Sequence, residues 1–272
     1  MSTPDRKHNS LGIFFTVTFA TSWACWLTAI AMGGSPMKSP AAIPYLLGAF
    51  GPTIGAIVIR LRREPTPAHT VRLRFNARLL WVPVFLAVAS ATVVAAVLVA
   101  NLPGGVNMSA GQHLIQTAGG LAPFIVAMLI GGPLSEEPGW RGTAYPRLRA
   151  SLGRVQAGLL LGVVWAAWHL PLFFIPGTVQ HTFGLASANG VLFLVSIIPA
   201  TFLTGFAYER AGVLGSIAVH FGINTTVALL AVDKPEILAL IIGIQVIVVA
   251  IPLALQRERR ADVQPRRTLA AG

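Results

Sequence analysis

The chain alternates long apolar stretches with short polar ones. A transmembrane helix needs about 20 mainly apolar residues, and eight stretches come close to that length. We predict helices over residues 11–32, 41–59, 79–100, 118–145, 155–175, 190–208, 211–230 and 236–255. The first is longer than the apolar region of a signal peptide, about 7–15 residues. The pattern therefore predicts an all-α membrane bundle of about eight transmembrane helices.

Polar segments separate these spans and delimit the domain. We expect loops without helices over residues 101–117 and 176–189. No polar stretch is long enough to form a second domain. We therefore predict one membrane domain over residues 11–255, between a polar tail at 1–10 and an Arg-rich tail at 256–272.

Composition and charge agree with a membrane protein. The chain is 54% hydrophobic and 11% charged, against about 25% charged in soluble domains. The net charge of +11 does not predict a nucleic-acid partner, because the basic residues flank apolar runs. The single cysteine, Cys25, has no second thiol for a disulfide or a thiolate metal site, and we interpret it as packing.

The distribution of Lys and Arg predicts the orientation. With the N-terminus in the cytoplasm, only Lys38 and Lys234 of the 20 basic residues fall on the outer side. This bias is typical of cytoplasmic loops. We therefore predict an integral protein of the plasma membrane with both termini in the cytoplasm.

Few strongly polar side chains lie within the spans, and three of them are close together. Glu136, Glu137 and Arg141 follow an apolar run in the fourth span. Glu137 and Arg141 are four residues apart, so they share a helix face and can pair. Glu136 then points about 100° away. Pro138 removes a backbone donor, and we expect a break in the helix beside the carboxylates.

Three more polar residues lie on other spans. His169 is in the fifth span, and His220 and Asn224 share one face of the seventh. Helix rise places Glu136, His169 and His220 about 15–22 Å from the basic ends of their helices, within a core about 30 Å thick. We therefore expect these side chains to meet in one polar cavity.

Such a set suits the activation of water, and two schemes are open. Glu136 could take a proton from water while a histidine and an asparagine donate hydrogen bonds to an oxyanion. Alternatively, Glu136, His169 and His220 could bind a divalent metal such as zinc with one open position. A structural ion cluster of Glu136, Glu137 and Arg141 at the helix end is the simpler interpretation.

The order of these motifs resembles a known family. Glu136-Glu137-x-x-x-Arg141, then Trp165-x-x-x-His169, then His220-x-x-x-Asn224 resembles the CPBP family of CAAX prenyl proteases and bacteriocin-processing or immunity proteins, also called the Abi family. The resemblance covers residues 118–230. The family pattern usually has phenylalanine at the position of Trp165.

The resemblance implies an intramembrane endopeptidase that cuts near the C-terminus of its substrate. All six motif residues would then belong to the catalytic site: Glu136 and His169 would activate water, and His220 and Asn224 would hold the oxyanion. The implied partners are a protein or peptide, with a lipidated one as an option, and membrane lipids. A metalloprotease and a metal-free enzyme both remain open.

Two alternatives do not require peptidase activity. A proton-coupled transporter also uses buried Glu, His and Arg. A non-catalytic scaffold or immunity factor would keep the fold and bind partner proteins, and it would tolerate substitution of Glu136.

Overall fold

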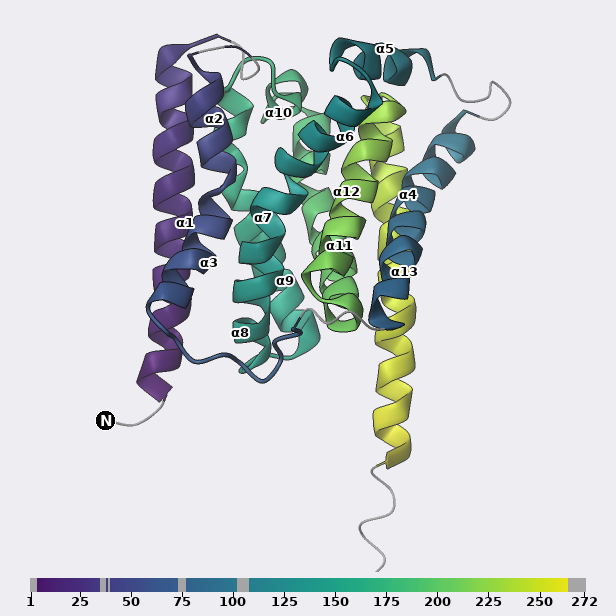
Figure 1. Ribbon diagram of the computed structural model, residues 1–272. Helices are drawn as coiled ribbons and strands as arrows, with labels where there is room; N and C mark the ends of the chain where they lie inside the picture. The colour runs from purple at the N-terminus through teal and green to yellow at the C-terminus, as the bar shows by residue number, and fades with distance from the viewer. Residues whose placement is uncertain (1–3, 35–37, 39, 73–76, 102–107, 264–272) are drawn as a thin grey trace, which may run out of the picture.

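The computed structural model describes residues 4–34, 38, 40–72, 77–101 and 108–263, of which 4–9 and 256–263 are described by their backbone only. These residues form helices and no strand, so the all-α prediction is confirmed (Figure 1). The α-helices are α1 (Pro4–Met32), α2 (Ala42–Ala49), α3 (Gly51–Leu61), α4 (Trp81–Ala100), α5 (Ser109–Thr117), α6 (Leu121–Ile130), α7 (Pro133–Gly139), α8 (Tyr145–Arg149), α9 (Arg154–Trp168), α10 (Val179–Phe183), α11 (Ala188–Ala211), α12 (Val213–Leu229) and α13 (Pro235–Val263). Two 3₁₀ segments, Ala77–Leu80 and Leu170–Phe174, and one π-helical segment, Trp140–Ala144, complete the described secondary structure.

The predicted spans appear in three forms. Five helical stretches are long and apolar enough to cross a membrane unaided: Ser10–Met32, Ala77–Ala100, Arg154–Phe174, Ala188–Ala211 and Pro235–Leu255. Two more spans are bent, by 52° between α2 and α3 and by 87° between α5 and the segment Leu121–Arg149. The predicted span 211–230 is the 17-residue helix α12, which is shorter than a typical span.

The predicted helix over 118–145 is interrupted at other positions than the expected one at Pro138. Gly119 and Gly120 both have positive φ, a conformation that glycine adopts easily, so α6 starts anew at Leu121. A second break at Gly131-Gly132 separates α6 from α7, and the π-helical segment separates α7 from α8.

Four predicted polar segments also contain helix. Residues 109–117, expected as loop, form α5, and residues 179–183 form α10, where the hydroxyl of Thr178 accepts a hydrogen bond from the His181 amide. The N-terminal helix already begins at Pro4, and α13 continues past 255 to Val263. The rest of both predicted tails lies outside the described residues.

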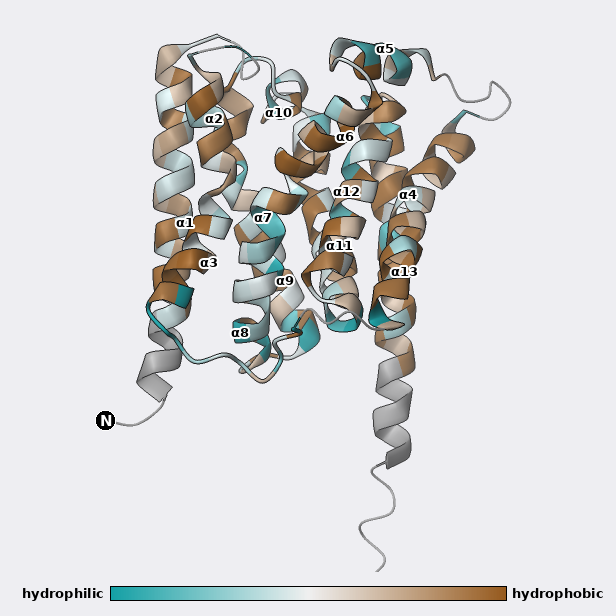
Figure 2. Ribbon diagram, in the orientation of Figure 1, coloured by the Kyte–Doolittle hydropathy of each residue, from teal (hydrophilic) through white to brown (hydrophobic). Residues whose placement is uncertain are grey.

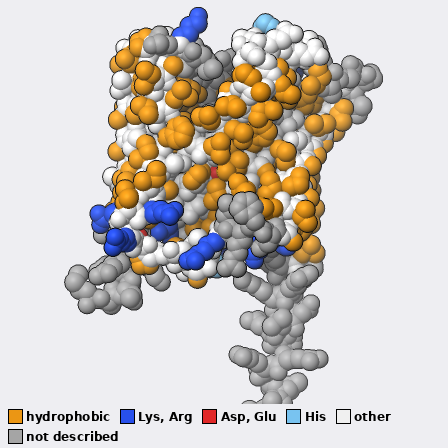
Figure 3. Space-filling model, in the orientation of Figure 1, with side chains coloured by type: hydrophobic (Ala, Val, Ile, Leu, Met, Phe, Trp, Pro, Cys, Tyr) orange, Lys and Arg blue, Asp and Glu red, His pale blue; other side chains and the backbone are white. Residues whose placement is uncertain are grey.

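The helices place both ends of the described chain at the same end of the bundle (Figure 1). The last turns of α3 and α11, which carry Arg60 and Arg210, lie at this end as well. Basic side chains gather there, and the flanks above are mainly apolar (Figure 3). This arrangement agrees with the predicted alternation of basic loops, while the side that faces the cytoplasm stays a prediction.

The short helix α7 lies inside the bundle at mid-height, and it is more polar than the apolar helices around it (Figures 1 and 2). It packs between α3 on one side and α12 on the other. A Cβ atom on Gly139 would overlap the backbone of Pro52, so α7 and α3 approach closely only because residue 139 is glycine. A cluster of Trp26, Trp140 and Trp168 fills the adjacent core, with ring centroids 4.6 and 5.7 Å apart.

Candidate active site

The break between α6 and α7 determines where the two carboxylates lie. Gly132 precedes the first turn of α7, and the hydroxyl of Ser135 donates a hydrogen bond of 2.9 Å back to its carbonyl. The hydroxyl of Thr53 on α3 donates to the Ser135 carbonyl at 2.7 Å. The first turn of α7 is therefore fixed both to itself and to α3.

The expected break at Pro138 takes a different form. Pro138 lies within α7, and the helix widens into a π turn after Gly139. The Thr143 hydroxyl donates to the Pro138 carbonyl at 3.2 Å. The break next to the carboxylates is the one at Gly131-Gly132.

Glu137 connects two helices through one oxygen. Its Oε1 accepts a hydrogen bond from Arg141 Nη1 at 3.1 Å, as the four-residue spacing predicted. The same oxygen lies 2.8 Å from Nδ1 of His220 on α12. The Glu137 and Arg141 side chains are both fully buried. Because a carboxylate accepts, His220 donates from Nδ1, and its Nε2 remains for the site.

Glu136 is also buried, with 4% of its surface exposed. Its Oε2 accepts a hydrogen bond of 2.7 Å from the indole Nε1 of Trp165 on α9. Neither His169 nor His220 hydrogen-bonds directly to Glu136 in the described part of the chain, although we expected all three to meet. The oxygen Oε2 of Glu136 is therefore held by Trp165, and Oε1 is the oxygen that does not take part in this bond.

His169 follows the last residue of α9, so the helix end determines its position. Its Nδ1 lies 2.8 Å from the carbonyl oxygen of Trp165. A carbonyl only accepts, so Nδ1 carries the proton and Nε2 is the basic nitrogen. The ring packs edge-on against Trp168 and Phe193.

Gly132 shows where the polar groups converge. A Cβ atom built on this glycine would lie close to three polar atoms: Asn224 Nδ2 at 3.4 Å, His220 Nε2 at 3.5 Å and Glu136 Oε1 at 3.6 Å. A carboxylate and two nitrogens from three segments thus surround one point, which we call the Gly132 point. It is open because residue 132 has no side chain.

Trp165 contacts more of the site than any pattern in the sequence indicated. Besides its bond to Glu136, its ring lies beneath the Arg141 guanidinium at 4.1 Å and edge-on to the His220 ring at 5.2 Å. The sequence indicates it only as an aromatic position four residues before His169. Indole is a hydrogen-bond donor, and this was the one available signal of its role.

The predicted metal ligands are Glu136, His169 and His220. Among the described residues, no three His, Cys, Asp or Glu side chains lie together in a way that could hold a metal ion. Each of these three side chains has one atom in a hydrogen bond within the protein and keeps a second one, Oε1 of Glu136 and Nε2 of each histidine. We therefore derive no step from a metal, and the zinc scheme stays a prediction.

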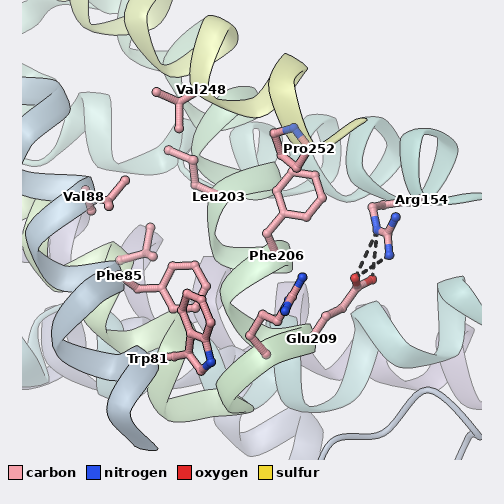
Figure 4. A pocket seen from close by; sticks show the side chains of 12 residues that line it. Trp81, Phe85, Val88, Arg154, Leu203, Phe206, Glu209, Val248 and Pro252 are labelled. Atoms are coloured by element: carbon pink, nitrogen blue, oxygen red, sulfur yellow. Dashed lines mark hydrogen bonds and ion pairs between the residues drawn. The ribbon is translucent and has the colours of Figure 1, made fainter. Parts of the chain in front are cut away.

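A groove at the basic end of the bundle is separate from this site (Figure 4). It has a volume of about 380 Å³ and lies between α4, α11 and α13, with Phe85, Leu203 and Val248 among its apolar walls. At its rim Arg154 bonds to Glu209 at 2.6 Å. None of the six predicted site residues lines the groove.

Comparison with known proteins identifies the same part of the chain. Residues 118–226 match the sequence model of the type II CAAX prenyl endopeptidase Rce1-like family. The chain is also similar to CAAX prenyl protease 2 of Methanococcus maripaludis, with 25% identity over 237 residues, which cover 82% of this chain and 85% of the relative. The family match contains all six predicted site residues and Trp165.

Proposed function

We propose that this chain is an integral membrane protease of the CPBP family, and that it cleaves a peptide bond near the C-terminus of a membrane-bound protein or peptide with water activated at the Gly132 point. The observation that supports this proposal is the convergence of Glu136 Oε1, His220 Nε2 and Asn224 Nδ2 on that point. A carboxylate beside two hydrogen-bond donors is what water attack on a carbonyl requires.

In the proposed reaction, Glu136 Oε1 accepts a proton from water as the water oxygen attacks the carbonyl carbon. The carbonyl oxygen becomes an oxyanion and receives hydrogen bonds from the Asn224 amide and the His220 ring. The tetrahedral intermediate then collapses, the C–N bond breaks, and the proton on Glu136 passes to the leaving amine. His169 presents a basic Nε2 from the end of α9, and we assign it to orienting the attacking water.

The role of His220 depends on its partners. Its Nδ1 donates to Glu137, so Nε2 can donate to an oxyanion only in the doubly protonated ring. The scheme uses that form of the ring, and Arg141 holds its partner Glu137 in place. In this scheme Glu137 and Arg141 act through His220 and do not touch the substrate.

The substrate class follows from the relative's name and from the position of the site. The relative is named a CAAX prenyl protease, so we propose a lipidated C-terminal peptide as the first substrate to test. The lipid would keep the peptide at the membrane while the scissile bond enters a site at mid-height in the bundle. We further propose that the protein lies in the plasma membrane with its basic end in the cytoplasm.

The test uses the purified full-length protein in lipid nanodiscs. A fluorescence-quenched peptide ending in a prenylated CAAX sequence is assayed beside its unprenylated copy. The wild type is expected to cleave the prenylated peptide, whereas Glu136→Gln and His169→Ala should each lower kcat by at least about 100-fold. Glu64→Gln, which alters an acidic residue paired with Arg62 outside the site, is the matched control.

The same assay separates the alternatives. A scaffold or immunity factor would show no Glu136-dependent cleavage of any peptide, and a transporter would show substrate or proton flux that Glu136→Gln abolishes. Full activity of Glu136→Gln would refute the proposed mechanism.

A further inference from the structure

We propose that Trp165 is the positioning residue of this site: its indole N–H holds one oxygen of Glu136 so that the other faces the Gly132 point. This inference rests on the proposed function, because it assigns Trp165 a role in presenting the proposed base.

The two carboxylate oxygens of Glu136 have different neighbours. Oε2 accepts the indole hydrogen bond at 2.7 Å, and Oε1 is the oxygen beside the Gly132 point. A glutamate side chain has three rotatable bonds, so a carboxylate without a partner would occupy several orientations. One short bond to a buried donor on α9 selects the orientation in which Oε1 meets water.

Trp165 also contacts the rest of the site. Its backbone carbonyl accepts the bond from His169 Nδ1 at 2.8 Å, which leaves Nε2 of His169 as the unprotonated nitrogen. One residue thus orients Glu136 through its side chain and His169 through its backbone, and these are the two groups proposed to act on water.

The ring of Trp165 is held from two further directions. Arg141 lies over its face at 4.1 Å, and His220 meets it edge-on at 5.2 Å. Arg141 and His220 are themselves joined through Glu137. The indole is therefore held by Arg141 and His220, which Glu137 joins on the oxyanion side of the site. Only 3% of the surface of Trp165 is exposed.

The substitution Trp165→Phe separates the hydrogen bond from the ring. Phenylalanine, the usual residue at this position in the family pattern, keeps an aromatic face for Arg141 but has no donor for Glu136. We expect kcat to fall about 10-fold or more with KM unchanged, because a hydrogen bond to a charged group is lost while the substrate contacts stay.

Trp140→Phe is the matched control. Trp140 is fully buried, and its indole N–H has no hydrogen-bond partner among the described residues. This change removes a similar amount of ring without freeing Glu136, so kcat is expected to stay within about threefold of wild type. A fall in kcat that is equal in both variants would mean that Trp165 acts only through packing, and it would overturn the proposal.

A second measurement does not depend on the folding of Trp165→Phe. Ultraviolet resonance Raman spectra report hydrogen bonding of indole N–H groups, and the chain has six tryptophans. Glu136→Ala should convert one strongly bonded indole to a weakly bonded one. An unchanged spectrum would refute the bond and with it the positioning role.

The outcomes also separate this inference from the proposed function. If Glu136→Gln is inactive and Trp165→Phe is fully active, only the role of Trp165 is wrong. If Glu136→Gln is fully active, the proposed function fails as well, whatever Trp165→Phe does.

Discussion

The most direct test of the site is to fill the Gly132 point with one methyl group by Gly132→Ala. The added carbon would lie 3.4–3.6 Å from Asn224 Nδ2, His220 Nε2 and Glu136 Oε1. These are ordinary contact distances for carbon, so no neighbour needs to move. A water oxygen hydrogen-bonded to the same atoms would sit about 2.7–3.2 Å from each, and the methyl group would occupy its place.

The expected result is an inactive protein that is still folded. A misplacement of about 1 Å at a reacting centre can cost about 100-fold in rate, so kcat should fall by at least that factor, or about 2.7 kcal/mol of transition-state stabilisation. The free energy of unfolding should change by no more than about 1 kcal/mol, since alanine at a compatible site alters mainly the entropy of the unfolded chain.

The assay measures kcat on the quenched peptide and Tm by tryptophan fluorescence in the same nanodisc preparation. Gly243→Ala on α13 is the control, because a Cβ atom there meets nothing within 4 Å. Activity of Gly132→Ala within threefold of wild type would refute the assignment of the reaction to this point. If Gly132→Ala lowers both Tm and activity strongly, the glycine is required for packing and not for the position of the water.

Further predictions concern the surroundings of the site. Glu137→Ala leaves a buried arginine unpaired and His220 without its acceptor, so thermal denaturation should show a loss of about 3–5 kcal/mol, and residual kcat should be low at a temperature where the variant is folded. Gly139→Ala forces α7 away from α3, so it should lower Tm strongly, and an unchanged Tm would contradict the close helix approach. Arg154→Ala removes a partly exposed ion pair with Glu209 and should cost about 1 kcal/mol or less with kcat unchanged; a large drop in kcat would link this ion pair to the reaction. Dialysis against a chelator is expected to leave activity intact, and a loss that zinc restores would favour the metal scheme.

Local periodicity was sufficient for the parts of the site that lie on one helix. The four-residue spacing predicted the Glu137–Arg141 pair, and the length of the apolar runs predicted the membrane bundle. The bond between Glu137 and His220 could not be predicted, because it depends on how α12 packs against α7. Spacing within a helix gives no information on that packing.

The breaks in the fourth span were missed for a different reason. Glycine is common in membrane helices, so Gly119-Gly120 and Gly131-Gly132 did not stand out within an apolar run. Their effect becomes clear only from the positive φ of the first pair and from the close polar neighbours of Gly132. The hydrogen bond of Trp165 was missed because tryptophan is counted among the hydrophobic residues.

The pairing of Glu137 with Arg141 has an electrical consequence. Moving one charge across a membrane is worth about 2.3 kcal/mol per 100 mV, but this pair carries no net charge. In the proposed reaction the proton moves only between water, Glu136 and the leaving amine, which lie within a few ångströms of one another. Turnover should therefore be independent of the membrane potential in sealed vesicles, unlike the flux of a proton-coupled transporter built from similar residues.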